Sequence, residues 1–136
     1  MRRVTQVLTT IRTMKKLTRK QLIKKLDRLV SEYVRKRDGH CVTCANPRGL
    51  PLTAGHLFSR VAHSARWNLL NIHAQCTGCN MYHEHNPHRF TSWFIQKFGL
   101  SKYEMLHACY STTLKHTTQM LEFKCQYMQR KIKGLK

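Results

Sequence analysis

Two short segments, Cys41-Val42-Thr43-Cys44 and Cys76-Thr77-Gly78-Cys79, decide how this chain folds. Each is a Cys-x-x-Cys pair, a spacing that lets two thiolates turn back onto one ion. Two such pairs supply the four sulfur ligands of a tetrahedral structural zinc site. Thirty-one residues, from Ala45 to Gln75, separate the pairs, more than the roughly 15–20 of a simple zinc ribbon. We therefore expect the intervening residues to carry chemistry.

Two disulfides are the alternative use of these four cysteines. Zinc needs free thiolates, which persist in a reducing compartment, and we favour zinc in a cytoplasmic protein. The remaining cysteines, Cys109 and Cys125, fall in helical patterns and are expected to be buried small hydrophobes. A mitochondrial transit peptide is one interpretation of the N-terminal segment, because residues 1–26 contain no acid and have an amphipathic pattern. The segment is poor in Ser, so we favour a nucleic-acid-facing arm.

The charge of the chain indicates a polyanionic partner. Its 136 residues include 25 Lys and Arg against 6 Asp and Glu, a formal net charge of +19. Such a surface attracts phosphate backbone at long range, and DNA is the expected partner. No apolar run reaches the roughly 18 residues of a membrane span, so no membrane partner is expected.

The basic residues concentrate at the N-terminal end. Residues 1–37 hold thirteen Lys and Arg against Asp27 and Glu32. A capping box at Thr18 and Gln21 predicts a helix that runs to Gly39. Its exposed face carries candidate DNA contacts at Lys24, Arg28 and Arg35, and its apolar stripe suits either a dimer interface or packing on its own domain.

Periodicity predicts the remaining elements. We expect strands near 52–57 and 69–75, a short helix from Thr77, a helix from Asn86-Pro87 to Gly99, and a helix opened by a capping box at Ser101 and Glu104. The organisation is then a basic helical arm over 1–38, a zinc-bound core over 39–100 and a C-terminal helical extension over 101–136, forming one compact domain.

The carboxylates argue against a two-metal nuclease. Such enzymes hold two divalent cations with several Asp or Glu side chains. Between residues 39 and 100 the chain has one carboxylate, Glu84, whereas eight of its nine histidines lie between His40 and His107. A one-metal mechanism with a histidine general base remains open.

A string of spaced motifs carries a family resemblance. Gly55-His56-Leu57-Phe58-Ser59-Arg60, followed by Asn71-Ile72-His73-Ala74-Gln75-Cys76 and Cys79-Asn80, resembles the HNH, or ββα-metal, endonucleases that carry a four-cysteine zinc. Within that group the chain is most similar to the NinG family of bacteriophage recombination proteins, over roughly residues 30–100. The resemblance implies an α+β, mostly helical fold, with a ββα-metal core and a four-cysteine zinc site flanked by N- and C-terminal helices.

The resemblance also implies roles for single residues. His56 matches the histidine that activates water for attack on phosphorus, and Asn71 matches the asparagine that orients it and fastens the loop. Asn80 matches the helix ligand of a catalytic Mg2+ or Mn2+. Glu84, four residues on, would share that helix face and be a second ligand, with His83 as its competitor. Arg60, His63 and Arg66 are candidate phosphate contacts in the loop.

One position departs from the family pattern. Most HNH sites have Asp or His directly before the base, where this chain has Gly55. We expect His73 to compensate as a ligand of the catalytic cation, because residues 71 and 73 of the second strand point to the same face and would both look toward His56.

The resemblance implies a structure-specific endonuclease that cuts branched DNA, such as Holliday junctions and D-loops. It further implies a phage-encoded protein in the cytoplasm of a bacterial host. Because cutting two strands of a junction is easiest with two sites, we also expect a homodimer. A non-catalytic zinc module that binds DNA is the alternative from another class, and Gly55 is its best argument. A sequence-specific nuclease of the same fold is a third hypothesis.

Overall fold

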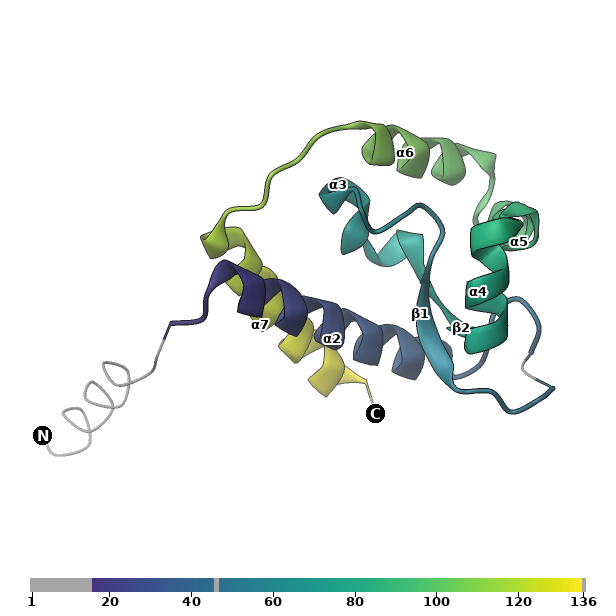
Figure 1. Ribbon diagram of the computed structural model, residues 1–136, viewed down its shortest axis with the longest axis horizontal. Coiled ribbons are helices and arrows are strands. Elements are labelled where there is room, and N and C mark those ends of the chain that lie inside the picture. The colour runs from purple at the N-terminus through teal and green to yellow at the C-terminus, as the bar shows by residue number, and fades with distance from the viewer. Residues whose placement is uncertain (1–15, 46, 136) are drawn as a thin grey trace, which may run out of the picture.

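The structure is a computed structural model that describes residues 16–45 and 47–135. The predictions for the N-terminal arm before residue 16 lie outside these residues. In chain order the elements are α2 Arg19–Asp38, β1 Leu52–His56, α3 His63–Arg66, a 3-10 turn Leu69–Asn71, β2 Ile72–Cys76, α4 Thr77–His85, α5 His88–Phe98, α6 Leu100–Ser111 and α7 Thr118–Gly134 (Figure 1). The chain is mostly helical around one small hairpin, which agrees with the α+β expectation. No helix of the described residues is long and apolar enough to cross a membrane.

Helix α2 begins and ends at the predicted signals. The Thr18 hydroxyl accepts the backbone N–H of Gln21, and the Gln21 side chain accepts the N–H of Thr18, which completes the capping box. Gly39 ends the helix with a φ of 73°, a left-handed conformation that glycine adopts without a steric penalty.

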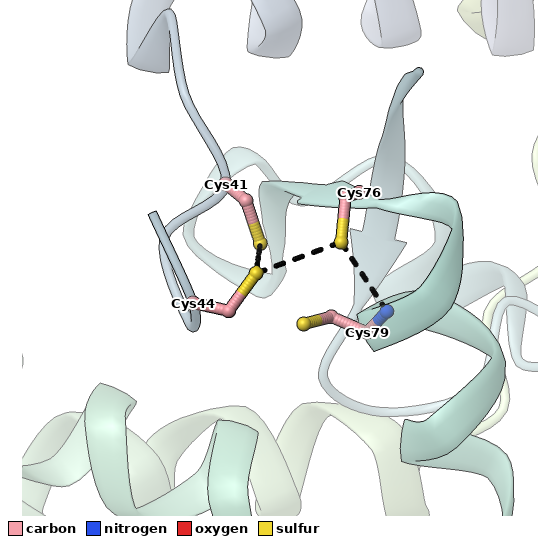
Figure 2. Close-up of side chains that lie close together, drawn as sticks. All are labelled: Cys41, Cys44, Cys76 and Cys79. Atoms are coloured by element: carbon pink, nitrogen blue, oxygen red, sulfur yellow. Dashed lines mark hydrogen bonds between the residues drawn. The ribbon is translucent and has the colours of Figure 1, made fainter. Parts of the chain in front are cut away.

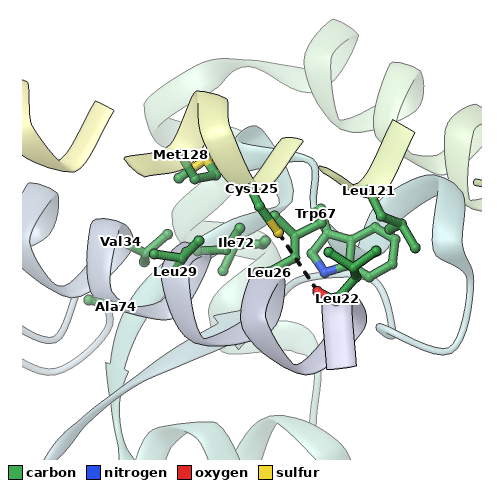
Figure 3. Close-up of a cluster of buried hydrophobic side chains, with 11 residues drawn as sticks. Leu22, Leu26, Leu29, Val34, Trp67, Ile72, Ala74, Leu121, Cys125 and Met128 are labelled. Carbon is green, nitrogen blue, oxygen red and sulfur yellow. Dashed lines mark hydrogen bonds between the residues drawn. The ribbon is translucent and has the colours of Figure 1, made fainter. Parts of the chain in front are cut away.

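The apolar stripe of α2 packs inside the chain. Helix α7 lies along α2 (Figure 1), and the two helices enclose a core with the hairpin (Figure 3). The core residues are Leu22, Leu26, Leu29, Val30, Val34, Trp67, Ile72, Ala74, Leu121, Cys125 and Met128. Of the two uses considered for the stripe, internal packing is therefore the one observed. Cys125 is buried as expected, whereas Cys109 on α6 is only half-buried.

The two strands pair antiparallel, from Leu52 opposite Cys76 to His56 opposite Ile72. Alternation gives the hairpin two faces. Ile72 and Ala74 contribute to the core against α2, so Gly55 and His73, which pair with each other, lie on the opposite face. The second strand was predicted to begin at Leu69 and instead begins at Ile72. The reason is local: the Asn68 side chain accepts the N–H of Leu70, and the Asn68 carbonyl accepts that of Asn71, which closes a 3-10 turn.

A second core lies between the hairpin end and helices α5 and α6. It contains Leu57, Phe90, Phe94 and Leu106. Helix α5 starts one residue later than predicted, although the Asn86 side chain still accepts the N–H of His88. The predicted capping box at Ser101 and Glu104 is wrong. Gly99 both ends α5 and caps α6, so α6 already begins at Leu100.

Candidate metal centre and histidine cleft

The two Cys-x-x-Cys pairs sit at the ends of regular structure. The first follows α2 in a tight turn, in which Ala45 donates its N–H to the Cys41 carbonyl and Val42 donates to Ala74 of β2. The second begins at Cys76, the last residue of β2, whose sulfur accepts the N–H of Cys79 in the first turn of α4. Strand β2 therefore brings the first pair to the second.

The four sulfurs converge as a zinc site requires (Figure 2). All lie within 4.8 Å of one another, and the Cys44 sulfur is 3.5 Å from that of Cys41 and 3.6 Å from that of Cys76. Tetrahedral Zn2+ with sulfur ligands at about 2.3 Å would set its sulfurs about 3.8 Å apart. None of the four cysteines forms a disulfide. The cluster is compatible with the predicted four-cysteine zinc site.

The pKa values of Cys41 and Cys79 are also compatible with a metal site at this cluster. Burial disfavours the Cys41 thiolate, but hydrogen bonds from Thr43 and from backbone N–H groups bring the pKa of Cys41 down to about 6. Burial and the neighbouring sulfurs raise the pKa of Cys79 to about 12. A divalent cation at the centre of the cluster would favour the thiolate form of Cys79.

His56, at the end of β1, has a fixed ring orientation. Its Nε2 lies 2.9 Å from the Arg66 carbonyl oxygen. A carbonyl only accepts, so Nε2 carries the proton and Nδ1 carries the lone pair. Burial lowers the pKa of His56, with Arg60 also lowering it. The imidazole is therefore neutral at neutral pH, as a general base must be.

His56 lines an open cleft of about 530 Å³ together with residues of α4. Asn80 and Glu84 face it from α4, and Arg60 lies at its exposed edge. The Asn80 Nδ2 donates to the Thr53 hydroxyl, which leaves the amide oxygen as the atom that could bind a cation. His83, the predicted competitor of Glu84, instead directs Nε2 to the Leu57 carbonyl at 3.0 Å. The structure thus brings the predicted base and two predicted cation ligands to one cleft.

Asn71 is fully buried and fastens the loop between the strands. Its Oδ1 accepts the N–H of Phe58, and its Nδ2 donates to the carbonyls of Phe58 and Ala65. Ala65 immediately precedes Arg66, whose carbonyl holds His56. Asn71 therefore positions His56 through the loop rather than by touching its ring.

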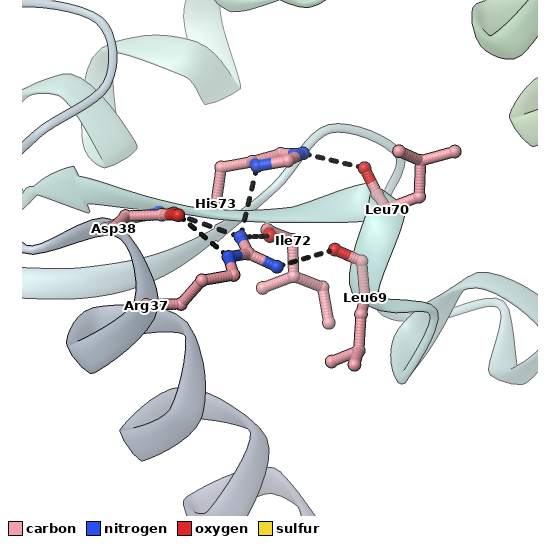
Figure 4. Close-up of polar contacts among 7 residues, drawn as sticks. Arg37, Asp38, Leu69, Leu70, Ile72 and His73 are labelled. Atoms are coloured by element: carbon pink, nitrogen blue, oxygen red, sulfur yellow. Dashed lines mark hydrogen bonds and ion pairs between the residues drawn. The ribbon is translucent and has the colours of Figure 1, made fainter. Parts of the chain in front are cut away.

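His73 does not reach His56, and the proposed compensation for Gly55 fails. His56 pairs with Ile72 and shares its face of the hairpin, whereas His73 pairs with Gly55 on the opposite face. Both ring nitrogens of His73 are occupied (Figure 4): Nε2 donates to Leu70 at 2.7 Å, and Nδ1 accepts from Arg37 at 3.2 Å. The ring also packs among the α5 aromatics and is 4% exposed. Neither nitrogen has a lone pair left for a metal.

Gly55 is explained by its neighbour Gln75. A Cβ added at Gly55 would lie 2.1 Å from the Gln75 Oε1. Gln75 is 1% exposed and fills the space in which a side chain at position 55 would begin. The absence of the usual strand ligand is therefore built into the packing of the hairpin.

The predicted DNA contacts divide into exposed and engaged residues. Lys24, Arg28, Arg35 and Arg60 are exposed. Arg66 instead forms an ion pair with Asp27, which also accepts the Trp67 indole N–H. His63 is half-buried against the Trp67 ring.

Sequence reasoning missed Arg37, which sits at the end of α2. Its guanidinium binds Asp38 and the carbonyls of Leu69 and Ile72 (Figure 4). Asp38 in turn accepts the N–H of Ala74. The signal in the sequence was an adjacent Arg-Asp pair before a glycine, which alone resembles an ordinary charged helix end.

Comparison with known proteins places the chain among phage proteins. The family model for the bacteriophage lambda NinG protein matches residues 3–136. The chain is 26% identical over 117 residues to protein NinG of Salmonella phage P22, and equally so to protein NinG of Escherichia phage lambda. Each alignment covers 84% of this chain but 57% of the relative, so the chain spans just over half the length of these relatives. No solved structure matches it. The chain belongs to the NinG family of bacteriophage proteins.

Proposed function

We propose that this protein is a metal-dependent endonuclease that cuts branched DNA, such as Holliday junctions and D-loops. The observation that supports it best is the orientation of His56, whose Nε2 is held by the Arg66 carbonyl in a cleft shared with Asn80 and Glu84. The preference for branched DNA rests on the family resemblance alone.

The proposed reaction is hydrolysis of one phosphodiester bond. His56 Nδ1 takes a proton from a water molecule, the resulting hydroxide attacks phosphorus, and the bond to the 3′ oxygen breaks. Asn80 and Glu84 offer the oxygen ligands that Mg2+ or Mn2+ prefers. When bound there, the cation would stabilise charge on the phosphate and on the leaving oxygen. Arg60, at the edge of the cleft, would bind an adjacent phosphate.

The basic face of α2 would hold the DNA by its backbone. Lys24, Arg28 and Arg35 are exposed on it, and contacts to phosphate read shape rather than base identity. Our proposal also includes a homodimer, because cutting two strands of a junction is simplest with two sites. Light scattering of the purified protein gives its oligomeric state directly.

A zinc module that binds DNA without cutting it is the second candidate. Gly55 supplies no ligand, and Gln75 occupies the adjacent space, so the cleft offers fewer strand ligands than most HNH sites. A nuclease with a fixed recognition sequence is a third candidate, distinguished by cleavage of linear duplex.

Replacing His56 by Ala separates these functions. Loss of a general base should slow nicking of a labelled four-way junction in Mg2+ or Mn2+ by about 10²–10⁴-fold, while junction binding in a gel shift persists. His85→Ala is the matched control, because His85 is exposed on α4 outside the cleft. A linear duplex of the same sequence should be cut less. Equal cutting by the His56 variant and wild type would refute the enzyme proposal.

A further inference from the structure

A second cavity, of about 710 Å³, opens beside the histidine cleft. Its volume lies within the roughly 300–1,000 Å³ of pockets that hold small ligands. It is lined by the start of α2, by the loop into α3, by the end of α6, and by the connection to α7, which passes α3 in Figure 1. Val61, 83% exposed, lines both this cavity and the cleft that contains His56. A DNA strand that leaves the cleft across the loop at Val61 would therefore enter the second cavity.

His116 is the most unusual group in its wall. The residue is 2% exposed, and neither ring nitrogen has a hydrogen-bond partner among the described residues. Its ring packs edge-on against Trp67 at 5.0 Å, and its carbonyl accepts a hydrogen bond from Arg19. Buried polar side-chain atoms are nearly always paired. An imidazole with two unpaired nitrogens beside a cavity thus suits a polar ligand.

The other residues around the cavity determine the charge of that ligand. Arg19, His63 and Lys115 line it, and none of its described lining residues is acidic. Burial lowers the pKa of His116 to about 4, with Lys124, His63 and Arg19 adding to the shift. The ring is therefore neutral at neutral pH and offers one N–H donor. A donor beside two permanent cations fits an anion such as a phosphate.

An aromatic side chain completes the site. Tyr110 lines the cavity, is 38% exposed, and is stacked on Phe58 with ring centroids 5.5 Å apart. Its phenol ring is thus held by packing while part of it remains accessible. Cationic grooves combined with aromatic faces are the usual way in which proteins bind single-stranded nucleic acid, because bases stack on the ring and phosphates meet the cations.

We propose that this cavity binds single-stranded DNA, with a phosphodiester between Arg19, Lys115 and His116 and a base on Tyr110. The inference deepens the proposed function, since it would direct an unpaired strand to or from the cleft at His56. Branched substrates offer such strands where duplexes meet.

Titration of the full chain with a thymidine tetranucleotide tests the proposal. To keep the DNA uncut, the titration is run without added Mg2+ or Mn2+. A chelator such as EDTA is avoided because it would interfere with the zinc cluster. Ring signals of the histidines are followed by NMR and that of His116 is assigned through its loss in His116→Gln. We expect the His116 and His63 signals to shift and saturate. Lys115→Gln should weaken binding about fivefold at 0.1 M salt and lower the salt slope by about 0.7, the single-strand value for one phosphate. The matched control Lys133→Gln, at an exposed position of α7 outside the cavity, should weaken binding less than twofold.

Three results would overturn the proposal. The His116 signal could stay unchanged while signals of exposed basic residues move. The Lys115 and Lys133 variants could weaken binding equally, which would indicate general attraction to a basic surface. Inorganic phosphate could shift His116 when the tetranucleotide does not, which would indicate a site for a free anion. Failure of the nuclease proposal is separate: absence of junction cutting with a shifting His116 signal would refute catalysis and leave this site in place.

Discussion

Replacing Asn71 by Ala tests how the candidate site is held in place. The substitution removes three hydrogen bonds at once, one from the Phe58 N–H and two to the carbonyls of Phe58 and Ala65. Leaving a buried polar group unpaired costs about 1–3 kcal/mol. Phe58 is half-buried and Ala65 is fully buried, so the groups at Phe58 regain part of their hydration. We therefore expect a loss of about 3 kcal/mol in the free energy of unfolding.

Urea unfolding with zinc held constant measures this loss. Asn68→Ala is the matched control, because Asn68 also uses its side chain in a local turn but makes one such bond, to the N–H of Leu70. Loss of a cap of this kind costs about 1 kcal/mol. Under conditions in which both variants are folded, Asn71→Ala should also cut junctions more slowly, since the loop that holds His56 is loosened. A loss below about 1 kcal/mol, no larger than for Asn68→Ala, would refute the reasoning.

Two further predictions follow from the metal centre and the buried titratable groups. The protein should contain one zinc ion per chain by elemental analysis. Cys44→Ser should lose both the zinc and the circular dichroism of the folded state, since structural zinc contributes on the order of 10 kcal/mol. A folded, zinc-free variant would contradict this. Stability should fall as the pH drops from 6.5 toward 4, because burial lowers the pKa of His73 from 6.5 to about 4 and the unfolded chain takes up the proton first. In His73→Gln, the free energy of unfolding measured in urea should depend less steeply on pH across this range. An unchanged slope would contradict the assignment of this pH dependence to His73.

Features set by neighbours in sequence were predicted well. The Cys-x-x-Cys spacing brings each pair of sulfurs together whatever the rest of the chain does, and the prediction that both pairs form one cluster is confirmed by the four converging thiols. The bounds of α2 also followed from residues at its own ends, Thr18 and Gly39. The same reasoning failed at Ser101, because a capping box acts only if the helix begins there, and Gly99 starts it earlier.

Features set by three-dimensional packing could not be predicted in this way. The face of the hairpin on which His73 lies depends on the register of the two strands, which pairs His73 with Gly55 and Ile72 with His56. Whether position 55 has room for a side chain depends on Gln75 of the partner strand. The apolar stripe of α2 gave no indication whether its partner would be α7 or a second chain, because both would present the same apolar surface.

The placement of His56 depends on a strand it does not belong to. An isolated two-stranded hairpin is marginally stable in water, yet every residue of β2 is buried, and groups outside the sheet bind it at Ile72, Ala74 and Cys76. Asn71, directly before β2, is bonded to Phe58 and Ala65 of the loop between the strands. Arg37 and Asp38 bind the backbone of Ile72 and Ala74. Cys76 ends it in the sulfur cluster. Since β1 is paired to β2 through a single register, these anchors determine where His56 lies relative to α4. The four-cysteine cluster at one end of the hairpin and His56 at the other therefore belong to one rigid unit, which explains why a chain with so small a sheet can hold a cleft of defined geometry.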